Sequence, residues 1–256
     1  MRDRFLCFVC VLNLLFISSL PLSLTAGAWP PVGPMSLSPS NVCFISTTYH
    51  QILDRGPTSS ELSAGITYLG SHTRAQYAST LLTGSEYQTD LIQSWYQRFL
   101  ARSATPGEVS AWLTVLTTGG TDEQVIANIV SSNEYFHLPR VGATNSGYVS
   151  ALYQSLLGRP PSPNELTTWL TAMSGSTTRL QVAQAILAST EYRTDLLQGW
   201  YRKYLDRPAT NGEVASGLSS FAAGAKDEDI IAGLIGLDEY FDRAGICRTD
   251  LPLSLR

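Results

Sequence analysis

Four glutamates recur at one spacing along the chain and are the first residues to consider for chemistry. Each lies 12 residues after a tyrosine and six residues after an arginine. Carboxylates at matched positions could act as general acids or bases, and a pair of them could cleave glycosidic bonds. The four residues are Glu61, Glu108, Glu165 and Glu213.

The residues before these glutamates favour a structural role. Each glutamate follows a hydroxyl residue by three positions, which is the spacing of a capping box at a helix start. The hydroxyl residues are Thr58, Thr105, Ser162 and Thr210. Pro106 and Pro163 occupy the first helical position, where proline loses no hydrogen bond. We therefore interpret the glutamates as caps and expect no catalytic residue among them.

An arginine and a second glutamate complete each unit of the pattern. The arginine ends a predicted helix, where it could bond terminal carbonyls, interact with the helix dipole or form an ion pair. The arginines are Arg55, Arg102, Arg159 and Arg207, and the second glutamates, each followed by tyrosine, are Glu86, Glu134, Glu191 and Glu239. We expect structural ion pairs between the two sets, with a ligand-binding arginine as the alternative.

The elements that carry these residues are predicted to be helices. Apolar pairs every four residues, such as Leu91-Ile92, Trp95-Tyr96 and Phe99-Leu100, form one wide apolar helix face. The pattern predicts three helices in each of four repeated units, which gives an all-α fold of about twelve helices. Nothing alternates with period two over the length of a strand.

The units are expected to form two tandem six-helix domains. A segment rich in Pro, Gly, Asn and Ser separates them and has the composition of a linker. Thr89-Asp90 and Thr194-Asp195 are expected to cap the helices that follow them. The predicted divisions are a signal peptide at 1–28, a Pro/Ser-rich lead-in at 29–43, domains at 44–138 and 148–243, a linker at 139–147 and a tail at 244–256.

The N-terminal residues are typical of a secretion signal. Arg2 and Arg4 precede an apolar run, and small residues at 26–28 suit cleavage after Ala28. This predicts a secreted, periplasmic or cell-surface protein, with an uncleaved anchor as the alternative and no membrane span after cleavage. Two cysteines outside the signal, Cys43 and Cys247, could then form a disulfide that ties the array's ends together, or remain buried thiols.

Composition and missing motifs exclude several classes of function. A net charge of −4 with only Lys203 and Lys226 as lysines disfavours nucleic-acid binding. No zinc motif, nucleophile elbow or phosphate-binding glycine loop is present, so we predict no metal, cofactor or catalytic residue. Asp122 and Glu123, as acids outside the repeated set, would be the first candidates in a glycan-cleaving enzyme.

Two strings carry a resemblance to a known family. "LYQSLLGRPPSPNELTTWL" (152–170) and "SEYQTDLIQSWYQRFL" (85–100) resemble the bacterial domain of unknown function 4214 family. The resemblance implies a helical module of secreted and surface proteins and supplies no catalytic residues. A weaker similarity to phycobilisome linker domains implies scaffolding by analogy only.

These features together predict a non-catalytic helical module that binds a protein or another envelope component. Binding of wall or extracellular polysaccharide is the first alternative, since exposed aromatic rings could stack on sugars. A glycan-cleaving enzyme is the second alternative.

Overall fold

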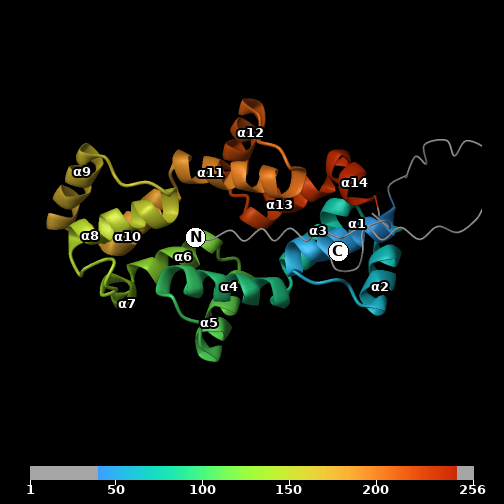
Figure 1. Ribbon diagram of the computed structural model, residues 1–256, viewed down its shortest axis with the longest axis horizontal. Coiled ribbons are helices and arrows are strands. Elements are labelled where there is room, and N and C mark those ends of the chain that lie inside the picture. The colour runs from blue at the N-terminus through green and yellow to red at the C-terminus, as the bar shows by residue number, and fades with distance from the viewer. Residues whose placement is uncertain (1–39, 247–256) are drawn as a thin grey trace, which may run out of the picture. The chain divides into compact units, whose positions relative to one another are not determined.

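The computed structural model describes residues 40–246, and this part of the chain contains helices and no strand (Figure 1). The all-α prediction is confirmed. The helices are α1 (Asn41–Leu53), α2 (Ser59–Leu69), α3 (Arg74–Leu82), α4 (Ser85–Leu100), α5 (Pro106–Thr117), α6 (Asp122–Ser131), α7 (Asn133–Phe136), α8 (Asn145–Leu152), α9 (Pro163–Ser174), α10 (Arg179–Leu187), α11 (Thr190–Trp200), α12 (Asn211–Ala222), α13 (Asp227–Gly236) and α14 (Asp238–Ala244). Two π-helical segments, η1 (Tyr153–Leu157) and η2 (Tyr201–Leu205), continue α8 and α11.

Local hydrogen bonds set most helix starts. Helices α2, α5, α9 and α12 each begin with the capping box described above. Helices α3, α6 and α10 begin with a threonine and a glutamine in the same arrangement. Helix α13 follows Lys226 instead, whose backbone N–H donates to Asp229 Oδ2 at 3.0 Å. These contacts satisfy N–H groups that have no partner within the helix.

Four helical stretches end at a residue with left-handed backbone conformation, directly before the repeated arginines. Asp54, Ala101, Gly158 and Asp206 have φ of 52°, 56°, 68° and 54°. A left-handed residue turns the chain out of the helix at its C-terminal end. Each repeated arginine therefore stands at the same place relative to the helix before it.

Two clusters of buried side chains form the core. One lies in the α4–α10 region and contains Ile92, Val125 and Val182. The other joins the two ends of the described chain, with Phe44 and Leu82 beside Ile235. Helix α6 packs on α10, and α3 packs on α13 so closely that a Cβ at Gly236 would lie 2.7 Å from Ala75 Cβ.

The core does not follow the predicted tandem grouping. Residues 44–82 share one cluster with residues 201–244, while residues 92–192 form the other. All described residues belong to one compact unit. The physical reason is that α3, α6, α10 and α13 each have a second apolar face. Each buries that face against a helix from the other half of the chain, α3 against α13 and α6 against α10.

Several predicted boundaries need correction. The segment 139–147 is not an open linker, because Val141 is buried and Ala143 N–H donates to Phe136 O at 3.2 Å. Helix α1 begins at Asn41, inside the predicted lead-in, where Ser40 Oγ accepts from Cys43 N–H. Thr89-Asp90 lies within α4 and Thr194-Asp195 within α11, since these helices start at Ser85 and Thr190. Helices α7 and α14 are additional to the predicted twelve.

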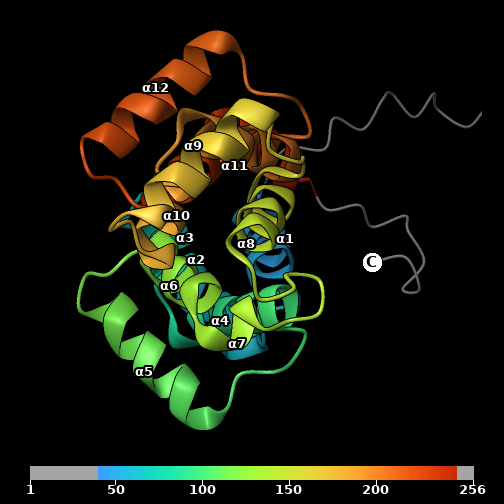
Figure 2. The ribbon, with the colours of Figure 1, turned by 90° about the vertical axis from the view of Figure 1, so that its left-hand side faces the viewer.

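Four helices lie at the periphery of this arrangement, and we call α2, α5, α9 and α12 the peripheral helices. Each packs mainly on the helix before it, and α9 contains no fully buried residue. Figure 2 shows α5 and α12 on the outside of the other helices. Within residues 40–246, no helix combines the length and apolar character needed to cross a membrane.

Candidate functional site

The repeated arginines, tyrosines and glutamates form four copies of one side-chain arrangement, which we call arginine stations. In the station of Arg102, Nε and Nη2 donate to the Glu134 carboxylate at 2.5 and 2.7 Å. Nη2 and Nη1 also donate to the Glu108 carboxylate at 2.8 and 3.0 Å. The guanidinium lies 4.9 Å from the centre of the Tyr96 ring, a cation–π distance.

The other three stations repeat these contacts. Arg55 binds Glu61 and Glu86, Arg159 binds Glu165 and Glu191, and Arg207 binds Glu213 and Glu239. Their guanidinium groups lie over Tyr49, Tyr153 and Tyr201. The structure thus places every predicted ion-pair residue in a station. It also joins each arginine to the capping glutamate, a contact that the sequence interpretation missed although the six-residue spacing is constant.

The stations hold their carboxylates in the charged form. Hydrogen bonds from Arg102 lower the pKa of Glu108 to about 2 and also lower the pKa of Glu134. Glu108 Oε2 accepts the Thr105 N–H at 2.7 Å, so one carboxylate serves the arginine and the helix cap together. Arg102 donates through Nε, Nη1 and Nη2, and a ligand would have to displace a glutamate. This geometry is structural and leaves the arginine little capacity for ligand binding.

A second group of acids lies where α6 and α13 begin. Asp122 and Glu123 open α6, and Asp227 and Glu228 open α13. Burial raises the pKa of Asp122 and of Asp227, and the carboxyl groups of the opposite helix raise them further. Oδ1 of Asp122 and Oδ1 of Asp227 are buried and accept no hydrogen bond from any described residue.

This group corrects one statement drawn from the sequence. The sequence analysis places Asp122 and Glu123 outside the repeated set, yet Asp227 and Glu228 occupy the matching positions in the second half of the chain. The signal is visible in the sequence as Asp-Glu, one residue before each of two similar apolar runs. The pairs face each other across the start of α6 and α13, and this proximity is what the sequence did not reveal.

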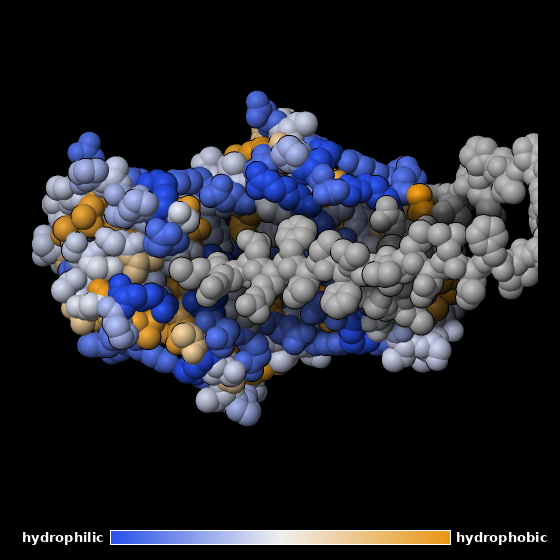
Figure 3. Space-filling view, viewed as in Figure 1, coloured by the Kyte–Doolittle hydropathy of each residue, from blue (hydrophilic) through white to orange (hydrophobic). Residues whose placement is uncertain are grey.

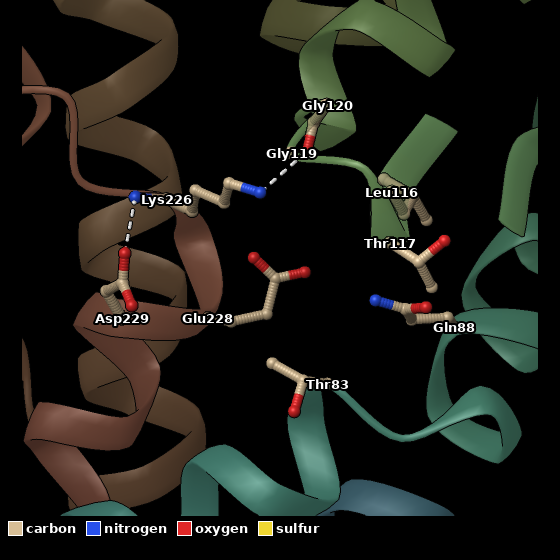
Figure 4. Close-up of a pocket in the computed structure, with 9 residues that line it drawn as sticks. All are labelled: Thr83, Gln88, Leu116, Thr117, Gly119, Gly120, Lys226, Glu228 and Asp229. Carbon is tan, nitrogen blue, oxygen red and sulfur yellow. Dashed lines mark hydrogen bonds between the residues drawn. The ribbon is translucent and has the colours of Figure 1, made fainter. Parts of the chain in front are cut away.

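Beside these acids is a cavity of about 310 Å³. Its walls come from the α3–α4 turn with the first turn of α4, from the end of α5 with the α5–α6 loop, and from the start of α13 (Figure 4). The lining residues are Thr83, Gln88, Leu116, Thr117, Gly119, Gly120, Lys226, Glu228 and Asp229. Lys226 Nζ donates to Gly120 O at 2.9 Å and joins two of these walls.

Polar side chains stand among the lining residues, and one of them has a buried atom without a hydrogen-bond partner. Gln88 is 5% exposed, and its Oε1 accepts no hydrogen bond within the described chain. Glu228 is 8% exposed, and burial raises the pKa of its carboxyl group. Figure 4 shows the Gln88 amide and the Glu228 carboxylate pointing into the space from opposite walls. The lining can bind a small polar molecule by hydrogen bonds, and the sequence analysis predicted none of its residues as part of a binding site.

The described residues do not gather a metal centre. Among residues 40–246, no group of three or more His, Cys, Asp or Glu is arranged to hold a metal ion. Cys43 lies buried in α1, where Ser40 Oγ donates to its Sγ at 2.9 Å. Cys247 and the predicted signal peptide lie outside the described residues, so the Cys43–Cys247 bridge and the secretion signal stay predictions.

Comparison with known families identifies one segment of the chain. Residues 139–196 match the family model described as "Domain of unknown function (DUF4214)". This segment contains the whole Arg159 station, with Glu165 and Glu191. No curated protein and no solved structure matches the chain. The similarity to phycobilisome linker domains is not shown and stays a prediction.

Proposed function

We propose that this protein is a non-catalytic helical module, acting outside the cytoplasm, that binds another protein through the outer faces of its peripheral helices. One observation carries the proposal. Each peripheral helix contains a single charged residue, and that residue is the glutamate already engaged in an arginine station. The outer faces of all four helices are therefore uncharged.

Apart from Ile66 of α2, the exposed residues of these faces are mostly small or hydroxylic. Helix α5 exposes Ser110, Ala111 and Thr114, and the surface that protrudes over α5 in Figure 3 is pale, between the hydrophilic and hydrophobic ends of the scale. Many hydroxyl groups bond their own helix. Thr114 Oγ1 donates to Ser110 O at 3.0 Å, and Thr167 Oγ1 donates to Pro163 O at 2.8 Å.

Such faces lose little hydration when they are covered. Burying a charged side chain requires a compensating partner, whereas a hydroxyl group that already donates to a carbonyl needs little further pairing. The stations fix the start of each peripheral helix, so the four faces are presented in a set arrangement. These properties support docking of a folded protein more than binding of a polyanion.

Site-specific photo-crosslinking tests the proposal. A photoreactive residue at Ser110 on α5 or Thr171 on α9 should crosslink one protein species in the secreted and envelope fraction of the source organism. The same residue at Asn128, exposed on the non-peripheral helix α6, should not. Equal crosslinking at all three positions, or capture of glycan alone, would overturn the proposal and favour polysaccharide binding.

Charge insertion gives the matched test. Ser110→Arg and Thr171→Arg place a charge on the proposed faces, while Asn128→Arg places the same charge elsewhere on the surface. Because all three positions are exposed, we expect unchanged thermal unfolding in each variant. Loss of the crosslinked partner only in the first two variants supports the proposal, and retention in both contradicts it.

A further inference from the structure

The cavity bounded by Gln88, Lys226 and Glu228 has the composition of a ligand site, and its lining restricts the chemistry of that ligand. We propose that it binds a neutral polyhydroxylated molecule of monosaccharide size. The cavity adjoins the C-terminal end of α5 through Leu116 and Thr117, and the proposal does not depend on the protein-docking function.

The first argument is the unmet hydrogen bonding of Gln88. A buried amide oxygen without a donor is destabilising, and its retention in a wall of the cavity is explained if a ligand supplies the missing bond. The side chain is 5% exposed, and its Oε1 accepts no hydrogen bond from the described residues. An amide needs both an acceptor for its N–H groups and a donor for its oxygen.

The second argument is the mixture of donors and acceptors around the space. The hydroxyl protons of Thr83 and Thr117 go to the helix carbonyls of Ser79 and Leu113 at 2.7 Å each. Their oxygens are left as acceptors, alongside the carboxylate of Glu228. Lys226 uses one N–H on Gly120 O and keeps two for a ligand. A hydroxyl group both donates and accepts, so a polyol can satisfy both sets.

Charge excludes the simpler alternatives. An anion would approach the carboxyl groups of Glu228 and Asp229, and an ammonium ion would meet the ammonium of Lys226. A neutral ligand avoids both repulsions. The volume of about 310 Å³ is at the lower end of the range for small-molecule sites and fits one sugar ring. Leu116 is the one apolar side chain of the lining, and no aromatic ring is present for stacking, so we expect millimolar affinity.

Nuclear magnetic resonance titration of the full chain tests the proposal. Glucose, galactose, mannose, N-acetylglucosamine and myo-inositol would each be added to about 50 mM, which saturates millimolar sites. We expect at least one to shift the backbone amide signals of Gly119, Gly120 and Glu228 in a saturable manner. Shifts caused instead by glycine, putrescine or calcium chloride, or by none of the sugars, would overturn it.

Two substitutions separate a ligand-binding role of Gln88 from a structural one. Gln88→Leu should weaken sugar binding about tenfold or more and raise the unfolding temperature, because it removes a buried amide oxygen that has no donor. Gln97→Leu, at an exposed position of the same helix, should leave binding unchanged. Glu228→Gln keeps the side-chain shape and should also weaken binding. Unchanged affinity in Gln88→Leu, or its unfolding at lower temperature, contradicts the proposal.

Discussion

The arginine stations and the acid group at the start of α6 and α13 shift the pKa of their carboxyl groups in opposite directions. In the stations, each glutamate accepts bidentate hydrogen bonds from a guanidinium. These bonds lower the pKa of Glu61, Glu108, Glu165 and Glu213 to about 2. At the start of α6 and α13, burial raises the pKa of Asp122, Asp227 and Glu228. The comparison shows that the residues repeated in all four units have a structural role here, whereas buried polar atoms without hydrogen-bond partners mark the candidate site.

The largest expected effect is a stability curve limited at both ends of the pH range. A station glutamate with a lowered pKa contributes stability above its unfolded pKa, and this contribution is lost as pH falls from about 4.5 to about 2. An acid with a raised folded pKa contributes stability below its unfolded pKa, and this is lost as pH rises through the folded pKa. Urea unfolding from pH 2 to pH 9 should therefore show a maximum between the two losses.

The double variant Asp122→Asn/Asp227→Asn shows which residues cause the loss of stability at each end of the pH range. It should flatten the decline at higher pH and leave the acid decline in place, because the stations are unchanged. If the acid decline flattens instead, the stations are not its source.

Breaking one station should cost about 2 kcal/mol of unfolding free energy. Arg102→Met removes four charge-assisted hydrogen bonds and leaves Glu108 and Glu134 facing each other, while the partial exposure of the pair limits the loss. The pKa of both glutamates should rise in carbon-detected titrations. Arg243→Met, which removes a more exposed pair with Asp206, is the control and should cost less than about 0.5 kcal/mol. Equal losses in the two variants would contradict the assigned role of the stations.

Neutralising one acid of the α6–α13 group should stabilise the protein by about 1 kcal/mol at pH 7. Asp227→Asn removes a buried carboxyl group whose Oδ1 accepts no hydrogen bond from the described residues. Glu213→Gln, a neutralisation within a station, should have the opposite sign. Urea midpoints measure both changes, and destabilisation by Asp227→Asn would show that the charge itself is needed there.

The smallest expected effect concerns the residue before each arginine. Ala101 has φ of 56°, a conformation that disfavours a side chain, and Ala101→Gly should stabilise the protein by about 0.5–1 kcal/mol. Gly158→Ala, at the matching position with φ of 68°, should destabilise it by a similar amount. Thermal unfolding compares the two, and changes of the same sign would contradict this account of the stations.

The sequence by itself determined the features that depend on short separations. Thr105 and Glu108 form a cap because residues three apart meet at a helix start, and the hydrogen bonds within that turn need no other part of the chain. The helix faces followed from the apolar spacing, and Glu134 was found as an ion-pair candidate because it recurs at a fixed place in each unit. All of this held because the interactions are either local or repeated.

Only the tertiary structure decided which helices pack together and where the cavity lies. The apolar faces of α3, α6, α10 and α13 are similar, so the sequence does not state that α3 packs on α13 and α6 on α10. Gln88, Gly120 and Lys226 come from separate segments and meet because of that packing. Their chemistry depends on burial and proximity, which arise from long-range packing, and no spacing in the chain encodes either one directly.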